Sequence, residues 1–140
     1  MITNIRINKV EAERASDDFV GNMKFNINFD DVKANGDNVD VHFTFLTQYE
    51  GGNSSTAKEV GNLKIVGVIS SKEEKKEIEE IKSAWDKNKT LPTGFAENVI
   101  NVLNFECGAK GTLLAYAMAF PAPLPLSRAK LQDKSENPAA

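Results

Sequence analysis

Two stretches in which apolar and polar residues strictly alternate place the strongest constraint on the fold of this chain. The first covers residues 23–29 (MKFNINF) and the second residues 39–45 (VDVHFTF), with looser alternation up to residue 49. A period of two puts the apolar side chains on one face of a β-strand. Asn35 and Gly36, which lie between the two stretches, tolerate positive φ angles. The sequence therefore predicts an antiparallel hairpin with one buried face.

Two further strands are predicted on either side of this hairpin. Residues 3–10 alternate in the same way, and residues 58–69 form the last strand. The end of that strand, residues 65–69 (IVGVI), is apolar on both faces. A helix can cover one face and another subunit can cover the other, so Val66 and Val68 are expected to favour self-association. Between the first two strands, residues 11–21 are predicted to form a polar connection.

A charged helix is predicted after the last strand, over residues 72–87. Its apolar residues recur at i, i+3 and i+7, which is the spacing of a narrow amphipathic stripe: Ile78, Ile81 and Trp85. Ser71 and Glu74 have the spacing of a capping box at its start. We therefore expect this helix on the surface, with most of its charge solvated.

A second helix is predicted after the break at Leu91-Pro92. Its apolar surface is much broader, so we expect it in the core: Phe95, Val99, Val102, Leu103 and Phe105. Gly108 and Gly111 leave two alternatives open, either a close approach of another backbone or a split of the helix before residue 113.

The end of the chain differs in composition from the rest. Residues 120–126 (FPAPLPL) alternate proline with apolar residues, which predicts an extended segment along a surface. From residue 127 the chain is polar. At 140 residues the chain fits a single core. We therefore expect one domain over residues 1–126 and a disordered tail over residues 127–140.

Several classes of partner and compartment are disfavoured. The net charge is −3 and the 17 Lys and Arg are scattered among 20 Asp and Glu, so no basic stripe is present for nucleic acid. The apolar stretches are too short or too interrupted by proline to cross a bilayer. The first seven residues lack the apolar run of a signal peptide. We therefore expect a cytoplasmic protein that does not insert into membranes.

The residues needed for catalysis or metal binding are also scarce. The chain has one histidine, His42, on the polar side of a predicted strand, and one cysteine, Cys107, in a predicted helix. Transition-metal sites normally use two or more such ligands, and nucleophilic catalysis needs a base next to the nucleophile. No glycine pattern matches a phosphate-binding loop. We therefore expect no metal, no cofactor and no enzymatic activity.

The order of these elements resembles the SecB-like chaperone family. The resemblance rests on the hairpin of residues 21–49, the strand of residues 60–69, the helix of residues 95–107 and the proline-rich residues 120–126. It implies an α+β fold in which a four-stranded antiparallel sheet is followed by two helices. It also implies paired subunits, so we expect a dimer or a tetramer. The helix over residues 72–87 departs from the family, whose better-known member has a shorter connection there.

Three functions are compatible with this pattern. In the first, the protein is a SecB-like holdase that binds unfolded polypeptides in apolar grooves. In the second, it is a structural or adaptor subunit whose apolar surface is covered by its own oligomer or by a fixed partner. In the third, it is a small enzyme that uses carboxylates alone. A role in protein export is left open.

Five residues are candidates for contacts with an unfolded client. They are apolar residues in the polar connection, at the end of the second predicted helix and in the proline-rich ending: Phe19, Val20, Met118, Phe120 and Leu124. An extended segment cannot bury its own side chains as a helix does. These side chains therefore either line an open groove or pack on the core.

Overall fold

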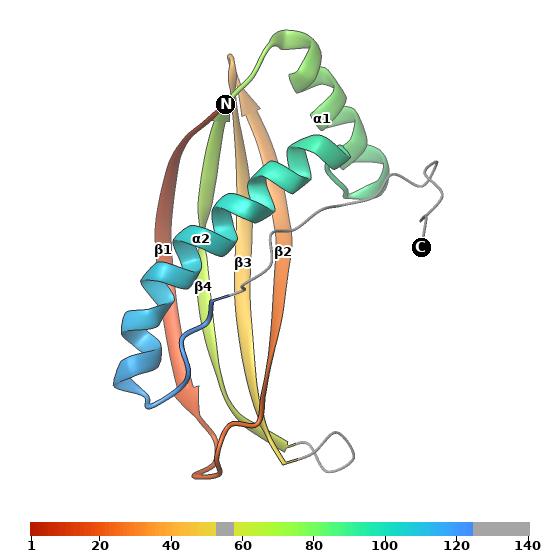
Figure 1. Ribbon diagram of the computed structural model, residues 1–140. Coiled ribbons are helices and arrows are strands. Elements are labelled where there is room, and N and C mark those ends of the chain that lie inside the picture. Colours follow the sequence, from red (N-terminus) through yellow and green to blue (C-terminus); the bar gives the residue numbers. More distant parts are fainter. Residues whose placement is uncertain (53–57, 125–140) are drawn as a thin grey trace, which may run out of the picture.

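The computed structural model describes residues 1–52 and 58–124. The first half is one antiparallel sheet with the strand order β1-β4-β3-β2 (Figure 1). The strands are β1 (Ile2–Arg14), β2 (Asn22–Asn35), β3 (Asn38–Gly51) and β4 (Lys58–Lys72). β2 and β3 form the predicted hairpin, and Gly36 in its turn has a φ of 64°. Glycine adopts this left-handed conformation without a steric cost, so the hairpin prediction is confirmed.

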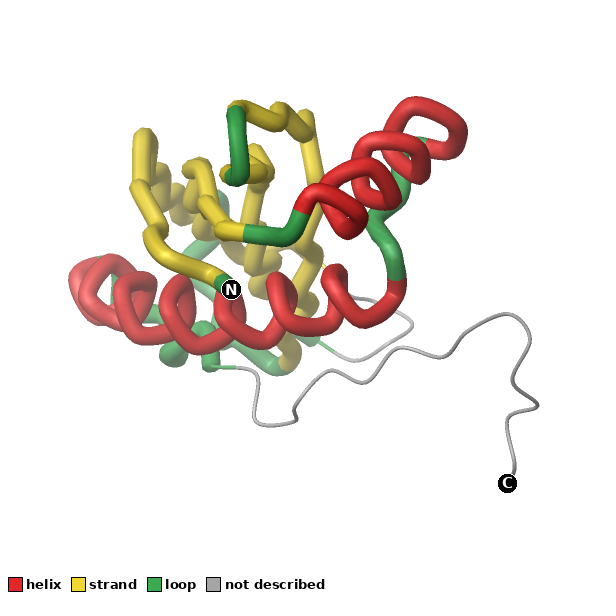
Figure 2. The backbone as a smooth tube through the Cα atoms, turned by 90° about the horizontal axis from the view of Figure 1, so that it is seen from above, coloured by secondary structure: helices red, strands yellow, loops and turns green. Residues whose placement is uncertain are grey.

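Two helices follow the sheet, α1 (Lys75–Asn88) and α2 (Thr93–Ala117). α2 crosses one face of the sheet obliquely, while α1 packs beside β2 at the edge of the sheet (Figures 1 and 2). Strands and helices are thus segregated along the chain, as in other α+β proteins. The predicted fold class, a four-stranded antiparallel sheet followed by two helices, is confirmed.

β1 is longer than the sequence pattern indicated. The strand continues through residues 11–14, which the sequence analysis assigned to a connection, and Ala12 and Arg14 pair there with Leu63 and Gly61 of β4. The inward-facing residues at this end of β1 are the small Ala12 and the charged Arg14. The alternation of large apolar and polar residues that predicts a strand is therefore missing here. The extension places the Arg14 side chain next to the end of α2, where its guanidinium donates hydrogen bonds to the carbonyl oxygen of Met118 at 3.1 and 3.3 Å.

The core lies between α2 and the two central strands. On the sheet it consists of Val39, Val41, Phe43, Phe45 and Tyr49 from β3 with Val60, Leu63, Ile65 and Ile69 from β4. The helices contribute Ile78, Ile81, Trp85, Val99 and Leu103. The predicted narrow stripe of α1 and two of the five predicted core residues of α2 are therefore buried.

The opposite face of the sheet exposes less apolar surface than expected. Val68 is only 5% exposed, and Val66 is half-buried. Arg6 on β1 and His42 on β3 lie directly opposite Val68 and flank it on the same face. The prediction that Val68 leaves apolar surface for another subunit is wrong, because longer side chains of the neighbouring strands cover it.

The start of α1 also differs from the prediction. Its N-cap residue is Glu74, whose side chain makes no capping hydrogen bond. Ser71 remains in β4, and its hydroxyl donates to Oε1 of Glu73 at 2.6 Å. The proposed capping box is therefore wrong. The helix ends at Lys89, which has a φ of 53° and donates its backbone N–H to the carbonyl oxygen of Trp85.

α2 is continuous through Gly108 and Gly111, so the helix is not split. A Cβ at Gly108 would lie 2.9 Å from Cδ2 of Leu124, and a Cβ at Gly111 would lie 2.8 Å from Cγ of Pro123. The two glycines therefore allow the proline-rich segment to approach the helix closely, which is the first of the two predicted alternatives. Phe105, by contrast, is 73% exposed, so its prediction as a core residue is wrong.

The chain after α2 turns back onto the sheet. Phe120 is 6% exposed, and its ring stacks on that of Tyr49 with 4.3 Å between centroids. The Tyr49 hydroxyl donates to the carbonyl oxygen of Pro121 at 2.9 Å. The Phe120 ring occupies the space above Gly61, where a Cβ would come within 2.3 Å of its Cζ. The predicted tail, residues 127–140, lies outside the described residues.

Candidate functional site

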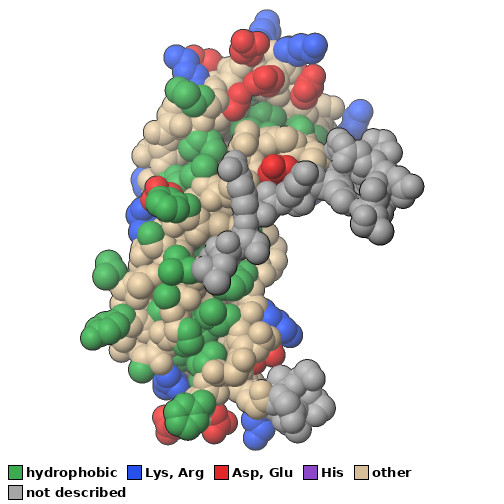
Figure 3. Space-filling model, in the orientation of Figure 1, with side chains coloured by type: hydrophobic (Ala, Val, Ile, Leu, Met, Phe, Trp, Pro, Cys, Tyr) green, Lys and Arg blue, Asp and Glu red, His purple; other side chains and the backbone are tan. Residues whose placement is uncertain are grey.

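The described part of the chain contains an open cleft of about 1210 Å³. It runs along the outer side of α2 and is bounded by α1, by the start of β1 and by Leu124. Apolar side chains gather over α2 on this face of the molecule, while acidic side chains gather near α1 (Figure 3). The cleft therefore lies where the two helices and both ends of the described chain meet.

The lining of the cleft combines apolar and acidic groups. The apolar residues are Met1, Ile2, Ile81, Pro92, Phe95, Val102, Phe105, Ala109 and Leu124. The ionisable side chains that line it within the described chain are all carboxylates: Glu73, Glu77, Glu80 and Glu106. Three asparagines of α2, Asn98, Asn101 and Asn104, add donors and acceptors. Such a surface can bury apolar side chains and attract basic ones at its rim.

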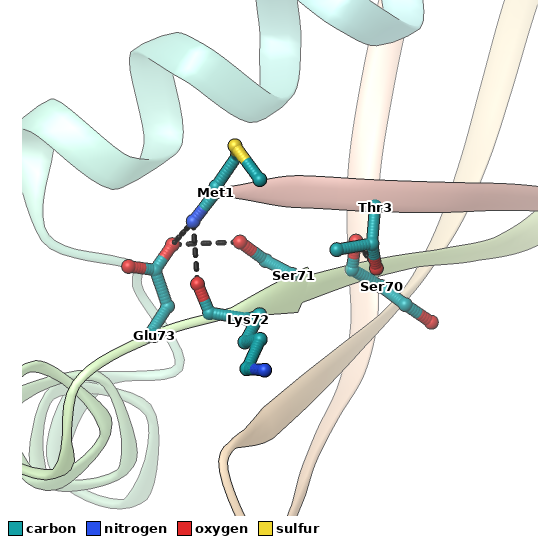
Figure 4. A network of polar contacts seen from close by, with 6 residues as sticks. All are labelled: Met1, Thr3, Ser70, Ser71, Lys72 and Glu73. Carbon is teal, nitrogen blue, oxygen red and sulfur yellow. Dashed lines mark hydrogen bonds and ion pairs between the residues drawn. The ribbon is translucent and has the colours of Figure 1, made fainter.

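A polar network holds one side of the cleft together. The amino group of Met1 donates to Oε1 of Glu73 at 2.9 Å and to the carbonyl oxygen of Lys72 (Figure 4). Partial burial of the Glu73 carboxyl raises its pKa, but hydrogen bonds from Ser71 and the Met1 amino group outweigh this effect and the net pKa is lowered. A hydrogen bond and charge repulsion from Glu73 raise the pKa of Glu77. The start of β1 is thus fixed to the residues that lead into α1.

The five candidate client residues do not form one surface. Leu124 lines the cleft and is 44% exposed. Phe19, which is 96% exposed, and the half-buried Val20 lie in the connection between β1 and β2, away from the cleft lining. Met118 is half-buried at the end of α2. Phe120 packs on the core and does not line an open groove.

Sequence analysis missed most of the cleft. Phe95, Val102 and Phe105 were assigned to the core because α2 is apolar around most of its circumference, and the sequence does not show which side meets the sheet. Glu77 and Glu80 were assigned to a solvated face of α1. The acidic run before a broadly apolar helix was the signal available in the sequence. The cleft itself arises only because residues of α1 and α2 line the same hollow in the folded chain.

The one histidine and the one cysteine of the sequence lie apart from this cleft. Cys107 is fully buried, and this burial raises the pKa of its thiol to about 12. His42 is half-buried on the opposite face of the sheet. Within residues 1–52 and 58–124, no three His, Cys, Asp or Glu side chains cluster as metal ligands. No helix in those ranges has the length and apolar character needed to cross a bilayer.

The fold gives the first point of comparison with known proteins. The four-stranded antiparallel sheet followed by two helices is consistent with the fold of a SecB-like chaperone of known structure. No protein-family model matches the sequence, and no curated protein matches it.

A comparison with solved structures identifies one protein with a similar fold. The chain is similar to the Mycobacterium tuberculosis Rv1957 SecB-like chaperone, whose structure was solved in complex with a ChAD peptide from the Rv1956 HigA1 antitoxin. The TM-score is 0.53 at 14% sequence identity, and the match covers 98% of this chain and 91% of that chain. At this identity the likeness establishes the fold alone.

Proposed function

We propose that this protein is a non-enzymatic, cytoplasmic SecB-like chaperone that binds non-native polypeptides in the cleft beside α2. The observation that carries the proposal is the cleft itself, because it joins exposed apolar side chains to a rim of carboxylates. The solved relative in fold binds a peptide, which supports a polypeptide as the ligand. The clients that fit best are extended segments with apolar side chains and neighbouring lysines or arginines.

The size and shape of the cleft agree with such a ligand. Its volume of about 1210 Å³ exceeds the ~300–1,000 Å³ of a typical small-molecule pocket, and it is open along the helix. Phe95 and Ile81 form an apolar floor between the helices, and Leu124 forms an exposed apolar edge. An extended peptide can place alternate side chains on the floor while its backbone remains near the asparagines of α2. Affinity then depends on buried apolar area rather than on one sequence.

Phe19, Val20 and Met118 are proposed as a second contact for long clients. Phe19 is 96% exposed, so its ring is accessible to a bound polypeptide. A client long enough to leave the cleft can reach this end of the molecule. A change at Phe19 should therefore affect long clients more than short peptides.

Suppression of aggregation tests the activity. A client diluted from denaturant should scatter less light in the presence of micromolar protein. Leu124→Ser should weaken client binding by about fivefold or more, because a leucine contact contributes roughly 1.5–3 kcal/mol when buried. Val10→Ser is the matched control, since Val10 is 48% exposed but lies outside the cleft lining.

The charge of the rim is tested separately. Glu77→Gln with Glu80→Gln should weaken binding of a lysine-containing peptide, and raised salt should weaken wild-type binding in the same direction. A peptide with the same apolar residues and no basic ones should be insensitive to both changes. If the wild-type protein neither suppresses aggregation nor binds peptide, the structural or adaptor subunit becomes the better description.

A further inference from the structure

We propose that residues 125–130 bind along one side of α2, with Arg128 paired to Glu97, and that they fill one edge of the cleft from within the same chain. The occupant of this surface is therefore a named part of the sequence, PLSRAK. The docking itself does not depend on client binding. It shortens the expected disordered tail, which was predicted to begin at residue 127.

The first observation is the direction in which the chain runs after α2. A Cβ built at Gly111 would lie 2.8 Å from Cγ of Pro123, and one built at Gly108 would lie 3.7 Å from Cα of Leu124. The chain therefore passes the second half of α2 in the direction opposite to the helix, over β4 and β3 (Figure 1). Leu124, the last residue that the structure describes, also lines the cleft. Residues 125–130 thus start at the edge of the cleft, close to the helix.

The second observation is the strip of α2 that lies ahead of this point. Positions 111, 108, 104, 101 and 97 are alternately three and four residues apart, so they form one line along the helix. Beyond the two glycines this line consists of Asn104, Asn101 and Glu97, which are all half-buried. An extended segment has no internal hydrogen bonds, and asparagine side chains can donate to and accept from its backbone. The strip therefore offers polar partners to a chain that continues in the same direction.

Distances along the helix and along an extended segment agree. At ~1.5 Å per helical residue, Asn101 lies roughly 10 Å and Glu97 roughly 16 Å beyond Gly108. At ~3.1 Å per residue of a proline-rich extended chain, Ser127 lies roughly 9 Å and Arg128 roughly 12 Å past the contact at Gly108. Ser127 therefore comes level with Asn101. The long side chain of Arg128 covers the remaining distance to the carboxylate of Glu97.

The charges of the segment and of the surface are complementary. The charged residues among 125–130 are Arg128 and Lys130, which are both basic. Glu97 is the ionisable residue of the strip, and the ionisable side chains that line the cleft within the described residues are also carboxylates. Opposite charges on segment and surface favour docking and fix its register.

The docked segment has a consequence for client binding, and this consequence rests on the proposed function. Asn101, Asn104 and Leu124 line the cleft, so a segment bound along them occupies one of its edges. A client then has to displace the segment, and its apparent affinity is reduced in proportion to the fraction of molecules in which this edge is open. Variants that release the segment should therefore bind clients more tightly.

Disulfide formation in the full-length protein tests the docking. Two cysteines can join when their Cα atoms are about 4.4–6.8 Å apart. Ser127→Cys with Asn101→Cys should form an intramolecular disulfide in a glutathione buffer, at an effective concentration at least about tenfold above that of Ser127→Cys with Val102→Cys. Val102 is the matched control, because it is also half-buried and follows Asn101 directly, but it lies about 100° around the helix.

Charge exchange tests the ion pair in the same cysteine background. Glu97→Arg and Arg128→Glu should each lower the effective concentration by about fivefold or more, and the two together should restore it. Lys134→Glu makes the same change of charge outside the segment and should have no effect. Without the added cysteines, Arg128→Glu should bind an apolar client peptide that lacks basic residues about two- to fivefold more tightly than the wild type, and Lys134→Glu should not.

The same measurements contain the outcomes that overturn the inference. An effective concentration for the Val102 pair that equals or exceeds that of the Asn101 pair contradicts docking along the strip. Loss in both single charge variants without recovery in the double variant contradicts the pairing of Arg128 with Glu97. Unchanged peptide affinity in Arg128→Glu contradicts the occupation of the cleft edge.

Two further checks keep these outcomes interpretable. Circular dichroism shows whether each variant is folded, and if Asn101→Cys prevents folding, Asn104→Cys with Leu126→Cys decides instead, because both lie roughly 6 Å past the contact at Gly108. If the wild-type protein binds no client at all, the proposed function fails, whereas the disulfide result still decides whether the segment docks.

Discussion

Replacing Phe120 by alanine tests how the proline-rich ending is held on the sheet. The Phe120 ring is 6% exposed and stacks on the ring of Tyr49. The guanidinium of Arg14 lies 4.7 Å from the centroid of the same ring. The ring also fills the space above Gly61, which has no side chain to occupy it. Removal of the ring should leave a cavity that neither the stiff sheet nor the proline-rich segment can close.

The magnitude follows from these contacts. A phenylalanine ring that buries about 200 Å² contributes roughly 4–5 kcal/mol at ~25 cal/mol per Å², and alanine retains part of this. Loss of the stacked pair adds about 0.5–1.5 kcal/mol. We therefore expect Phe120→Ala to lower the free energy of unfolding by about 3–5 kcal/mol, the range seen for buried aromatic residues.

Urea unfolding followed by circular dichroism measures this loss. Phe105→Ala is the matched control, because it removes the same ring from a position that is 73% exposed, and it should cost less than about 1 kcal/mol. A loss below about 1 kcal/mol for Phe120→Ala would refute the placement of this ring in the core. Client binding by Phe120→Ala, measured below its unfolding transition, should be close to that of the wild type.

Further expectations concern the helix glycines and the titratable groups. Gly111→Ala should lower the free energy of unfolding by about 1–2 kcal/mol, because the close contact outweighs a helix-propensity gain of about 1 kcal/mol; Gly94→Ala, which has nothing within 4 Å, should raise it by a few tenths to about 1 kcal/mol. The thiol of Cys107 should react with a disulfide reagent at pH 8 only as fast as the protein unfolds, because burial raises its pKa to about 12. Burial also raises the pKa of Tyr49 to about 12, so its contribution to stability is present below about pH 10 and is lost as the pH rises towards 12. Denaturation at alkaline pH should show this decline in the wild type and a smaller one in Tyr49→Phe. His42→Ala should leave peptide affinity unchanged within about twofold in an anisotropy titration.

The sheet was predictable from the sequence because its two-residue period is explicit. Residues 23–29 and 39–45 alternate without interruption, and Asn35-Gly36 marks the turn between them. The last four residues of β1 were missed because Arg14 occupies an inward-facing position, and a charged residue there is tolerated only through the carbonyl groups at the end of α2. That partner lies more than 100 positions away in the sequence, so local pattern cannot reveal it.

The helices show a second limit of sequence analysis. α1 has a narrow stripe, so its buried side was evident. α2 has apolar residues around most of its surface, and the sequence does not say which of Phe95, Leu103 and Phe105 meets the sheet. The proline-rich segment approaches α2 on the side that carries Gly108 and Gly111, and this side of the helix is therefore covered. The candidate cleft depends on this rotation of α2 and on the position of α1, and both are properties of tertiary packing.

Hydrogen exchange with and without a permanently unfolded client tests the proposed binding site most directly. Slower exchange is expected in α1, in the first half of α2 and in the segment that ends at Leu124, and the same regions should lose this protection in Leu124→Ser. The outer face of the sheet around His42 should exchange at the same rate in both samples. Binding without protection of the cleft, or protection confined to the connection that holds Phe19, would contradict the assignment of the cleft as the client site.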